Sequence, residues 1–297
     1  MRRGFLLIGL FALCFTAYVA AGPGGQGAQG QNPPAPAGRG PFGFAQGRQG
    51  AGAQGGGRGQ GDAAQGGRGR AAGPPPTARA QAPRDFTGYW VSVVTEHWHL
   101  RMTMPPKGEY AMLPLNPDAR RIADAWDPAK DKAEGGECKS YGAPNIMRVP
   151  SRYNIHWTDD NTLQMDVDSG TQTRQFHFGG AAPADFAPQW QGYSVAAWEG
   201  VTAGRGPARL NGQMRVVTTK MRPGYLRKNG VPYSENARLE EYFETFTEPN
   251  GDRWMVVTSV ITDPQYLTQP YTTTYPYKKI QDRAGWDPTP CRVDEPR

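Results

Sequence analysis

Cysteine and histidine are rare in this chain, whose 297 residues include three cysteines and four histidines. Cys14 lies in an apolar stretch at the N-terminus, so Cys138 and Cys291 are the two that remain beyond it. No further cysteine or histidine lies near either of them at the spacing of a metal-ligand set, which argues against a metal-bound thiol. Two cysteines in an exported protein usually pair, and we therefore predict a disulfide between Cys138 and Cys291.

Long apolar runs are also scarce, and the mean hydropathy is −0.67. The clearest run, Gly4–Val19, follows Arg2 and Arg3 and ends in the small residues Ala20 and Ala21. A charged start, an apolar centre and a small-residue end are typical of a secretory signal peptide, here residues 1–21. A membrane span needs about 20 apolar residues, so a retained anchor is the weaker alternative. We expect a secreted or periplasmic protein with no membrane span after cleavage.

Acidic residues are almost missing from residues 22–84, where Asp62 is the only one among seven arginines. Two more arginines lie in residues 1–21 and the whole chain carries +6, so residues 85–297 carry −2. A segment of Gly, Gln, Ala, Pro and Arg cannot bury enough surface to offset the entropy of ordering it, which predicts a disordered tether. Its Arg-Gly repeats are like those of RNA-binding segments, but export separates the chain from nucleic acid. We expect a spacer, or loose attachment to an anionic envelope surface.

From Asp85 onward, short runs rich in Val, Thr, Tyr, Trp and Phe alternate with polar residues, as strands do. One helix is predicted from Asn116, which can cap it, to Trp126, and a second at Pro128–Glu134. We predict one all-β domain over residues 85–297, a closed antiparallel barrel of about ten strands with one or two short helices near its start. A two-sheet sandwich is the alternative. The predicted strands are Gly88–Thr95, Glu96–Thr103, Asn145–Val149, Tyr153–Thr158, Thr162–Val167, Thr171–Phe178, Tyr193–Glu199, Met214–Thr219, Ala237–Thr247, Arg253–Ile261 and Tyr271–Lys279.

Signatures of common catalytic sites are missing, because the sequence has neither a Gly-x-Ser-x-Gly elbow nor a phosphate-binding loop. His97 and His99 are two residues apart on a predicted strand and would share one face. A third ligand would be needed to hold a metal there, and no carboxylate follows them on that strand, so we predict no metal and no cofactor. His97, His99 and Asp166 are the candidate catalytic residues; the alternative is that they are packed or solvated side chains.

The segment from Met221 to Ser234 holds two prolines, two glycines, three cations and two tyrosines. A long polar loop between strands often covers a binding cavity, although it can also be a structural crossover. Arg222 and Arg227 could hold a carboxylate or phosphate by two-point hydrogen bonds. A barrel of about eight to ten strands is wide enough for one small ligand. The predicted ligand-binding residues are Trp98, Arg101, Arg174, Arg222, Tyr225, Arg227, Tyr233, Glu240 and Tyr242.

Two segments carry a resemblance to known proteins. Trp190–Gly200 reads Trp-Gln-Gly-Tyr-Ser-Val-Ala-Ala-Trp-Glu-Gly, and Asp263–Pro270 reads Asp-Pro-Gln-Tyr-Leu-Thr-Gln-Pro, with the acidic-aromatic run Leu239–Glu244 between them. They resemble a large group of uncharacterised secreted bacterial proteins that share W-x-G-[HY]-S-x-[GA]-x-W-E-G and D-P-x-x-[YL]-T-x-P. The chain departs from the group's W-E-G-D-T-L continuation at residues 201–211. The resemblance implies export and a lipocalin-like barrel, and it implies no particular activity.

The sequence supports three functional hypotheses. The first is a binding protein that holds a small apolar or aromatic molecule in the barrel, under the segment Arg222–Tyr233. The second is an extracellular or periplasmic enzyme, a hydrolase, lyase or isomerase, that acts in the same cavity. The third is an envelope scaffold without a small ligand, which predicts a barrel interior filled with side chains.

Overall fold

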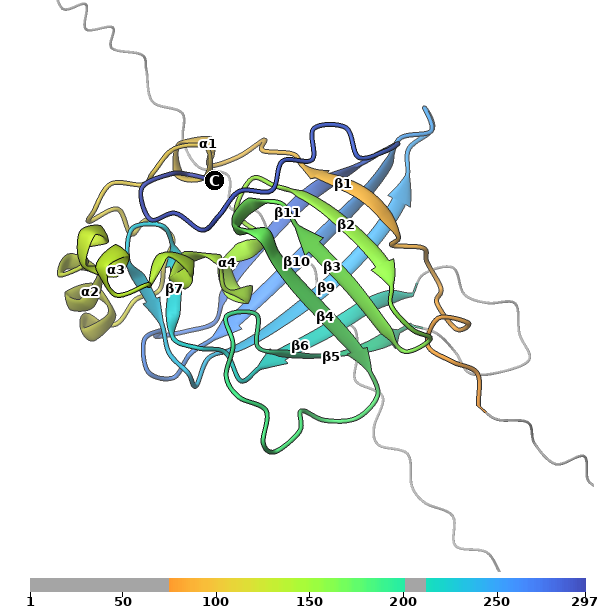
Figure 1. Cartoon of the computed structure of the whole chain (residues 1–297), viewed down its shortest axis with the longest axis horizontal. Helices are drawn as coiled ribbons and strands as arrows, with labels where there is room; N and C mark the ends of the chain where they lie inside the picture. Colours follow the sequence, from red (N-terminus) through yellow and green to blue (C-terminus); the bar gives the residue numbers. More distant parts are fainter. Residues whose placement is uncertain (1–74, 201–211) are drawn as a thin grey trace, which may run out of the picture. The chain divides into compact units, whose positions relative to one another are not determined.

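The computed structural model describes residues 75–200 and 212–297. The predicted signal peptide, most of the predicted tether and the segment 201–211 lie outside the described residues. Nine strands close into a barrel in the order β1-β11-β10-β9-β6-β5-β4-β3-β2, and two more form a separate hairpin (Figure 1). The barrel strands are β1 (Gly88–Ser92), β2 (Arg152–Trp157), β3 (Thr162–Val167), β4 (Gln172–Phe178), β5 (Tyr193–Glu199), β6 (Gln213–Thr219), β9 (Arg238–Thr247), β10 (Arg253–Thr262) and β11 (Tyr271–Ile280).

Alternate side chains of these strands point into the barrel and fill it. Along β3, for example, Leu163, Met165 and Val167 are buried while the residues between them are partly exposed. Successive side chains of a strand point to opposite faces of the sheet, so this pattern places one apolar set inside. The predictions of a closed barrel and of an interior built by period-two burial are confirmed, and the two-sheet sandwich is wrong.

The barrel is mixed rather than antiparallel, which corrects the prediction. β4 and β5 run parallel, with Phe176 opposite Ser194 and Phe178 opposite Ala196. Parallel neighbours need a crossover of about a dozen residues or more, and the connection 179–192 supplies it. The predicted antiparallel arrangement assumed hairpins throughout, whereas this long connection returns the chain to the end of the barrel from which β4 started.

Two predicted strands are wrong. Within Glu96–Thr103, the chain instead forms α1 (Trp98–Arg101), a short helix that buries Leu100 and Arg101. Within Asn145–Val149, it forms the end of α4 (Ala143–Ile146), with a proline in the first turn. Both segments are rich in residues that favour strands, but packing at the end of the barrel outweighs this weak local preference.

The helical segments and the hairpin gather at one end of the barrel (Figure 1). α2 (Pro117–Asp124) begins after Asn116, whose side chain accepts a hydrogen bond from the backbone N–H of Ala119, and α3 (Pro128–Ala133) begins after Asp127. Both predicted helices are therefore confirmed. The segment predicted as a loop, Met221–Ser234, is instead the hairpin of β7 (Gly224–Arg227) and β8 (Val231–Tyr233). A 3₁₀ helix, η1 (Glu137–Tyr141), packs beside it, and a second, η2 (Ser169–Thr171), joins β3 to β4.

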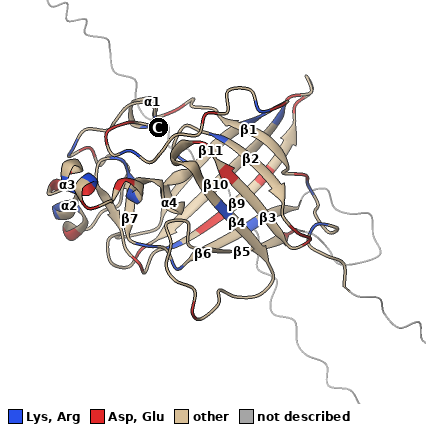
Figure 2. Ribbon diagram, viewed as in Figure 1, with Lys and Arg blue, Asp and Glu red and all other residues tan. Residues whose placement is uncertain are grey.

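Apolar residues form two clusters in the described chain. The first fills the barrel and includes Trp90, Tyr153 and Phe243, whereas the second lies under α2 and the hairpin and includes Tyr233 and Leu239. Acidic and basic residues are interspersed along the strands and the helical end (Figure 2). Two of them, Arg174 and Glu241, are wholly buried and paired, and Glu241 lies on β9 between Leu239 of one cluster and Phe243 of the other.

Both ends of the described chain are attached to the barrel. Residues 75–84, which the prediction assigned to the tether, pack against it: the Trp198 indole donates to the carbonyl of Ala78, and Arg84 donates to the carbonyl of Gly212. At the C-terminal end the predicted disulfide between Cys138 and Cys291 is present. It fastens residues 281–297, here called the C-terminal strap, to η1. Among the described residues, no helix is both long and apolar enough to cross a membrane.

Candidate functional site

A pocket of about 510 Å³ lies at the helical end of the barrel. One wall is six consecutive residues of β11, Tyr271–Pro276, with Val256 of β10. The other walls come from the segment Thr95–Arg101, from Met112, and from two arginines of distant segments. The pocket is therefore assembled from parts of the chain that only the closed barrel brings together.

Three arginines line this pocket, and all are nearly inaccessible to solvent. Arg101 is 3% exposed, Arg148 is 8% exposed and Arg227 is 1% exposed. Arg101 comes from the last turn of α1, Arg148 from the turn after α4, and Arg227 from the tip of the β7–β8 hairpin. We call these three residues the arginine cluster.

Backbone carbonyls hold the arginine cluster in place. Arg101 Nε donates to the carbonyl of Arg148 at 2.9 Å, and Arg148 donates in return to the carbonyl of Leu100. Arg227 Nη2 donates to the carbonyl of Ala111 at 2.7 Å. These bonds do not use every N–H donor of the cluster: Arg101 Nη2 and Arg227 Nε are buried without a hydrogen-bond partner. Guanidinium groups present five donors in a fixed plane, so the unused ones are fixed in direction.

No carboxylate within the described ranges forms an ion pair with any member of the arginine cluster. Burial, together with the charges of Arg227 and Arg101, lowers the pKa of Arg148. A buried charge without a partner is costly, and removing one member of a buried ion pair typically costs about 3–5 kcal/mol. Three such cations side by side therefore form a site where an anion would be strongly favoured.

Aromatic and apolar groups surround the arginine cluster. The guanidinium carbon of Arg101 lies over the Tyr275 ring, 4.1 Å from its centre, which is a cation–π contact. Burial raises the pKa of Tyr275, so its hydroxyl stays protonated and available as a donor. Tyr271, Leu100 and Met112 complete the apolar lining. The pocket thus combines fixed cationic donors with a surface suited to apolar or aromatic groups.

Strained backbone also marks the pocket. His97 and Met112 both line it, and both adopt positive φ angles, 53° and 65°. Residues other than glycine seldom adopt this region, at a cost of roughly 1–2 kcal/mol each. Such strain tends to persist at binding and active sites, which supports the choice of this pocket.

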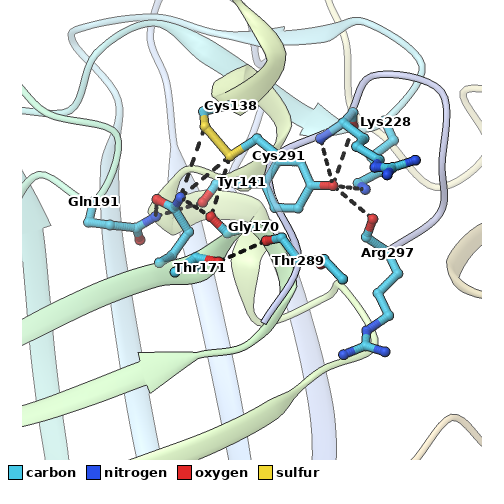
Figure 3. Close-up of a disulfide and its surroundings, with 11 residues drawn as sticks. Cys138, Tyr141, Gly170, Thr171, Gln191, Lys228, Thr289, Cys291 and Arg297 are labelled. Carbon is cyan, nitrogen blue, oxygen red and sulfur yellow. Dashed lines mark hydrogen bonds between the residues drawn. A yellow bond between two sulfur atoms is a disulfide. The ribbon is translucent and has the colours of Figure 1, made fainter. Parts of the chain in front are cut away.

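The C-terminal strap contacts the tip of the β7–β8 hairpin at Lys228, the residue after Arg227 (Figure 3). Lys228, the next residue, donates to the hydroxyl of Tyr141 at 2.6 Å and to the carbonyl of Glu295 at 2.7 Å. The Tyr141 hydroxyl in turn donates to a terminal oxygen of Arg297 at 2.8 Å. Burial lowers the pKa of Lys228 to about 7, although the nearby carboxyl of Glu295 acts in the opposite direction. The strap therefore fixes the position of the tip.

The structure brings two of the nine predicted ligand-binding residues, Arg101 and Arg227, into this pocket. Trp98 is exposed on α1, and Arg222 is exposed with its guanidinium over the Trp190 ring. The remaining five lie elsewhere. Arg174 pairs with Glu241 inside the barrel, Tyr225 donates to the Asp131 carboxylate, and Tyr233 is buried in the second apolar cluster. On the outer face of β9, the Tyr242 hydroxyl donates to the Glu240 carboxylate.

The three candidate catalytic residues do not meet. His97 lines the pocket, His99 is exposed on α1, and Asp166 lies on β3 with His156 3.7 Å away. His97 and His99 do not share a strand face, because this segment is helical. Nowhere in residues 75–200 and 212–297 do three or more His, Cys, Asp or Glu side chains gather as a metal site would require. The geometry gives no support to a catalytic group built from these residues.

Sequence reasoning missed Arg148, Tyr271 and Tyr275. Arg148 was placed on a predicted strand, and the two tyrosines were counted only as part of a strand that the structure confirms. The signal that could have pointed to them is weak: Arg148 stands between Ile146-Met147 and Val149-Pro150, so its neighbours in the sequence are apolar. Nothing local links it to Arg101 or Arg227.

Residues of the two resemblance motifs have structural roles here. Gln191 donates to the carbonyl of Tyr141, and Asp263 accepts hydrogen bonds from the backbone and the hydroxyl of Ser234. Both motifs, Trp190–Gly200 and Asp263–Pro270, lie outside the pocket. No family model matches the chain, and neither a curated protein nor a solved structure is significantly similar to it. The assignment of function therefore depends on the geometry of the pocket.

Proposed function

We propose that this chain is an exported binding protein whose pocket holds an anionic group attached to an apolar or aromatic body. The observation that carries the proposal is the arginine cluster: three buried guanidiniums without a carboxylate partner in the described chain, lining a cavity of about 510 Å³. A carboxylate or phosphate in the pocket would neutralise charge that no ion pair among the described residues compensates.

The contrast with Arg174 supports this reading. Arg174 is as deeply buried as the arginine cluster, but Glu241 pairs with it through two hydrogen bonds of 3.0 and 2.5 Å. The fold thus supplies a carboxylate where a buried arginine serves only the barrel. At the pocket the only carboxylate in the described lining is that of Glu96, which forms no ion pair with the arginine cluster, and the cavity is large enough for a ligand to provide one.

The experiment is to titrate small probe molecules into the full chain at constant ionic strength. Binding is measured by calorimetry, and stabilisation of the folded state is measured by thermal unfolding. Benzoate and phenyl phosphate are the anionic probes, and benzamide is the neutral probe of the same shape. A ligand at 100 times its dissociation constant stabilises the folded state by ~2.7 kcal/mol, which is roughly 5–10 °C for a domain of this size. We expect at least one anionic probe to produce such a shift and benzamide to produce none.

Arginine-to-glutamine variants test whether the anionic probe binds at the arginine cluster. Arg101→Gln and Arg227→Gln should each weaken binding of the anionic probe at least tenfold, because each removes a buried donor and a charge. Arg222→Gln is the matched control, since Arg222 is exposed and lies outside the pocket. Equal shifts by benzoate and benzamide, or equal effects of the control and the pocket variants, would overturn the proposal.

A further inference from the structure

The wall of the pocket contains a strand edge that the barrel leaves open. β1 pairs with β11 only from Tyr89 opposite Ile280 to Ser92 opposite Tyr277, and one further bond joins the N–H of Val93 to the carbonyl of Pro276. Beyond that point, Tyr271–Pro276 of β11 have β10 on one side and, within the described ranges, no strand on the other. The chain after Val93 diverges from β11, and the pocket lies between Thr95–His97 and this edge.

Backbone groups of β11 point toward the open edge. The N–H and C=O of one residue in an antiparallel strand point to the same side, and successive residues alternate. Since the carbonyl of Pro276 is directed to the β1 side, Thr274 and Thr272 direct their backbone groups to that side too. Unpaired edges of this kind form templates for a further strand. Thr272 and Thr274 are exposed, so an approaching chain can reach them.

The arginine cluster lies behind this edge, on the inner face of the sheet. Tyr271, Thr273 and Tyr275 point inward, and the Arg101 guanidinium lies over the Tyr275 ring. A residue directly opposite on a neighbouring strand has its Cβ about 5 Å from that of its partner. An inward-pointing Asp or Glu of an added strand, opposite Thr273 or Tyr275, would therefore place its carboxylate among the three guanidiniums.

Exposed apolar side chains flank the same opening. The four large apolar side chains that are most exposed in the described chain include Trp98 at 63%, Met102 at 52% and Met112 at 55%. Met112 lines the pocket and Trp98 lies in the segment Thr95–Arg101 that borders it, whereas Met102 lines a separate pocket. Met112 and Trp98 thus add apolar surface at the pocket.

We propose that the ligand of this pocket is an extended peptide segment of a partner protein, which adds a strand to the edge Tyr271–Pro276 and sends an acidic side chain to the arginine cluster. The inference rests on the proposed anion-binding function and specifies its ligand. At about 3.3 Å per residue, six edge residues match a peptide of about five or six residues. Backbone hydrogen bonds to Thr272 and Thr274 give affinity, and the arginine cluster gives preference for acid.

The test uses the full chain and fluorescently labelled peptides in anisotropy titrations. The probe is acetyl-Thr-Val-Glu-Val-Thr-amide, which has no terminal charge. Its controls are the same peptide with Gln in place of Glu, the same peptide with alternate backbone nitrogens methylated, and acetylglutamate amide as the acid without a strand. We expect saturable binding of the Glu peptide and losses of at least tenfold with Gln, with methylation and with the single amino acid.

The outcomes separate the two proposals. Methylated and unmethylated peptides that bind equally, or acetylglutamate amide that binds as tightly as the peptide, would overturn strand addition while leaving anion binding intact. Glu and Gln peptides that bind equally would overturn the role of the arginine cluster in peptide binding. Failure of the peptides together with failure of benzoate and phenyl phosphate would overturn both. Because the changes are made in the ligand, no result depends on the folding of a variant.

Discussion

The buried pair of Arg174 and Glu241 gives the sharpest prediction about the barrel. Both side chains are inaccessible to solvent, and two hydrogen bonds of 3.0 and 2.5 Å join them. In Glu241→Gln the shape is kept but the arginine loses its countercharge. We expect the free energy of unfolding to fall by about 3–5 kcal/mol, the usual cost of leaving one buried partner alone. The single change Arg174→Met should cost a similar amount, because it leaves the Glu241 carboxylate unpaired.

The double variant tests whether the two buried charges of Arg174 and Glu241 compensate each other. Arg174→Met with Glu241→Leu removes both charges and fills the space with apolar groups, so its stability should lie close to that of the natural chain or above it. The assay is equilibrium unfolding in urea with the disulfide intact, analysed as a double-mutant cycle. If the double variant instead loses the sum of the two single costs, the two charges do not compensate each other and the reasoning is refuted.

Further predictions concern the strap and the turns. Burial lowers the pKa of Lys228 to about 7, whereas the unfolded chain keeps this pKa near its usual value. The free energy of unfolding should therefore rise from about pH 7 to pH 10, by at most ~1.4 kcal/mol per pH unit. In urea unfolding, Lys228→Met should lose this pH dependence. Replacing Cys138 and Cys291 by serine should lower stability by up to about 5 kcal/mol, and limited proteolysis should then cut the strap first. Gly192→Ala should cost at least about 1–2 kcal/mol in the same assay, because φ is +58° and the added Cβ would lie 2.4 Å from the carbonyl of Thr219.

Much of the fold follows from local patterns. Strands such as Thr162–Val167 and Arg253–Thr262 are long enough to show alternation, and Asn116 with Pro117 marks the start of a helix. Failures occur where long-range packing decides. The segment around Trp98 has strand-like composition but lies beyond the point where β1 stops pairing, so it turns into α1. The parallel pairing of β4 with β5 depends on where residues 179–192 cross, which composition does not reveal.

The site was harder to predict than the fold because its parts are remote in sequence. Arg101 and Arg148 lie 47 residues apart on the long connection from β1 to β2, Arg227 is the last residue of β7, and no spacing rule relates the three. Arg227 was predicted because its segment is dense in cations, and Arg101 was predicted as a ligand-binding residue on what was taken to be a strand. Arg148 lacks such a context. What distinguishes the three is that they are buried and have no carboxylate partner in the described chain, a combination that exists only in the folded structure.

The central claim is that the arginine cluster is a preformed site for an anionic group. The most direct test is nuclear magnetic resonance of the arginine Nε–H groups in the full chain, assigned with Arg101→Gln, Arg148→Gln and Arg227→Gln. We predict that the Nε–H signal of Arg227, which has no partner in the structure, shifts and saturates as phenyl phosphate is added, while the signal of exposed Arg222 stays unchanged. Signals that do not respond, or that all respond in proportion to ionic strength, would contradict the account.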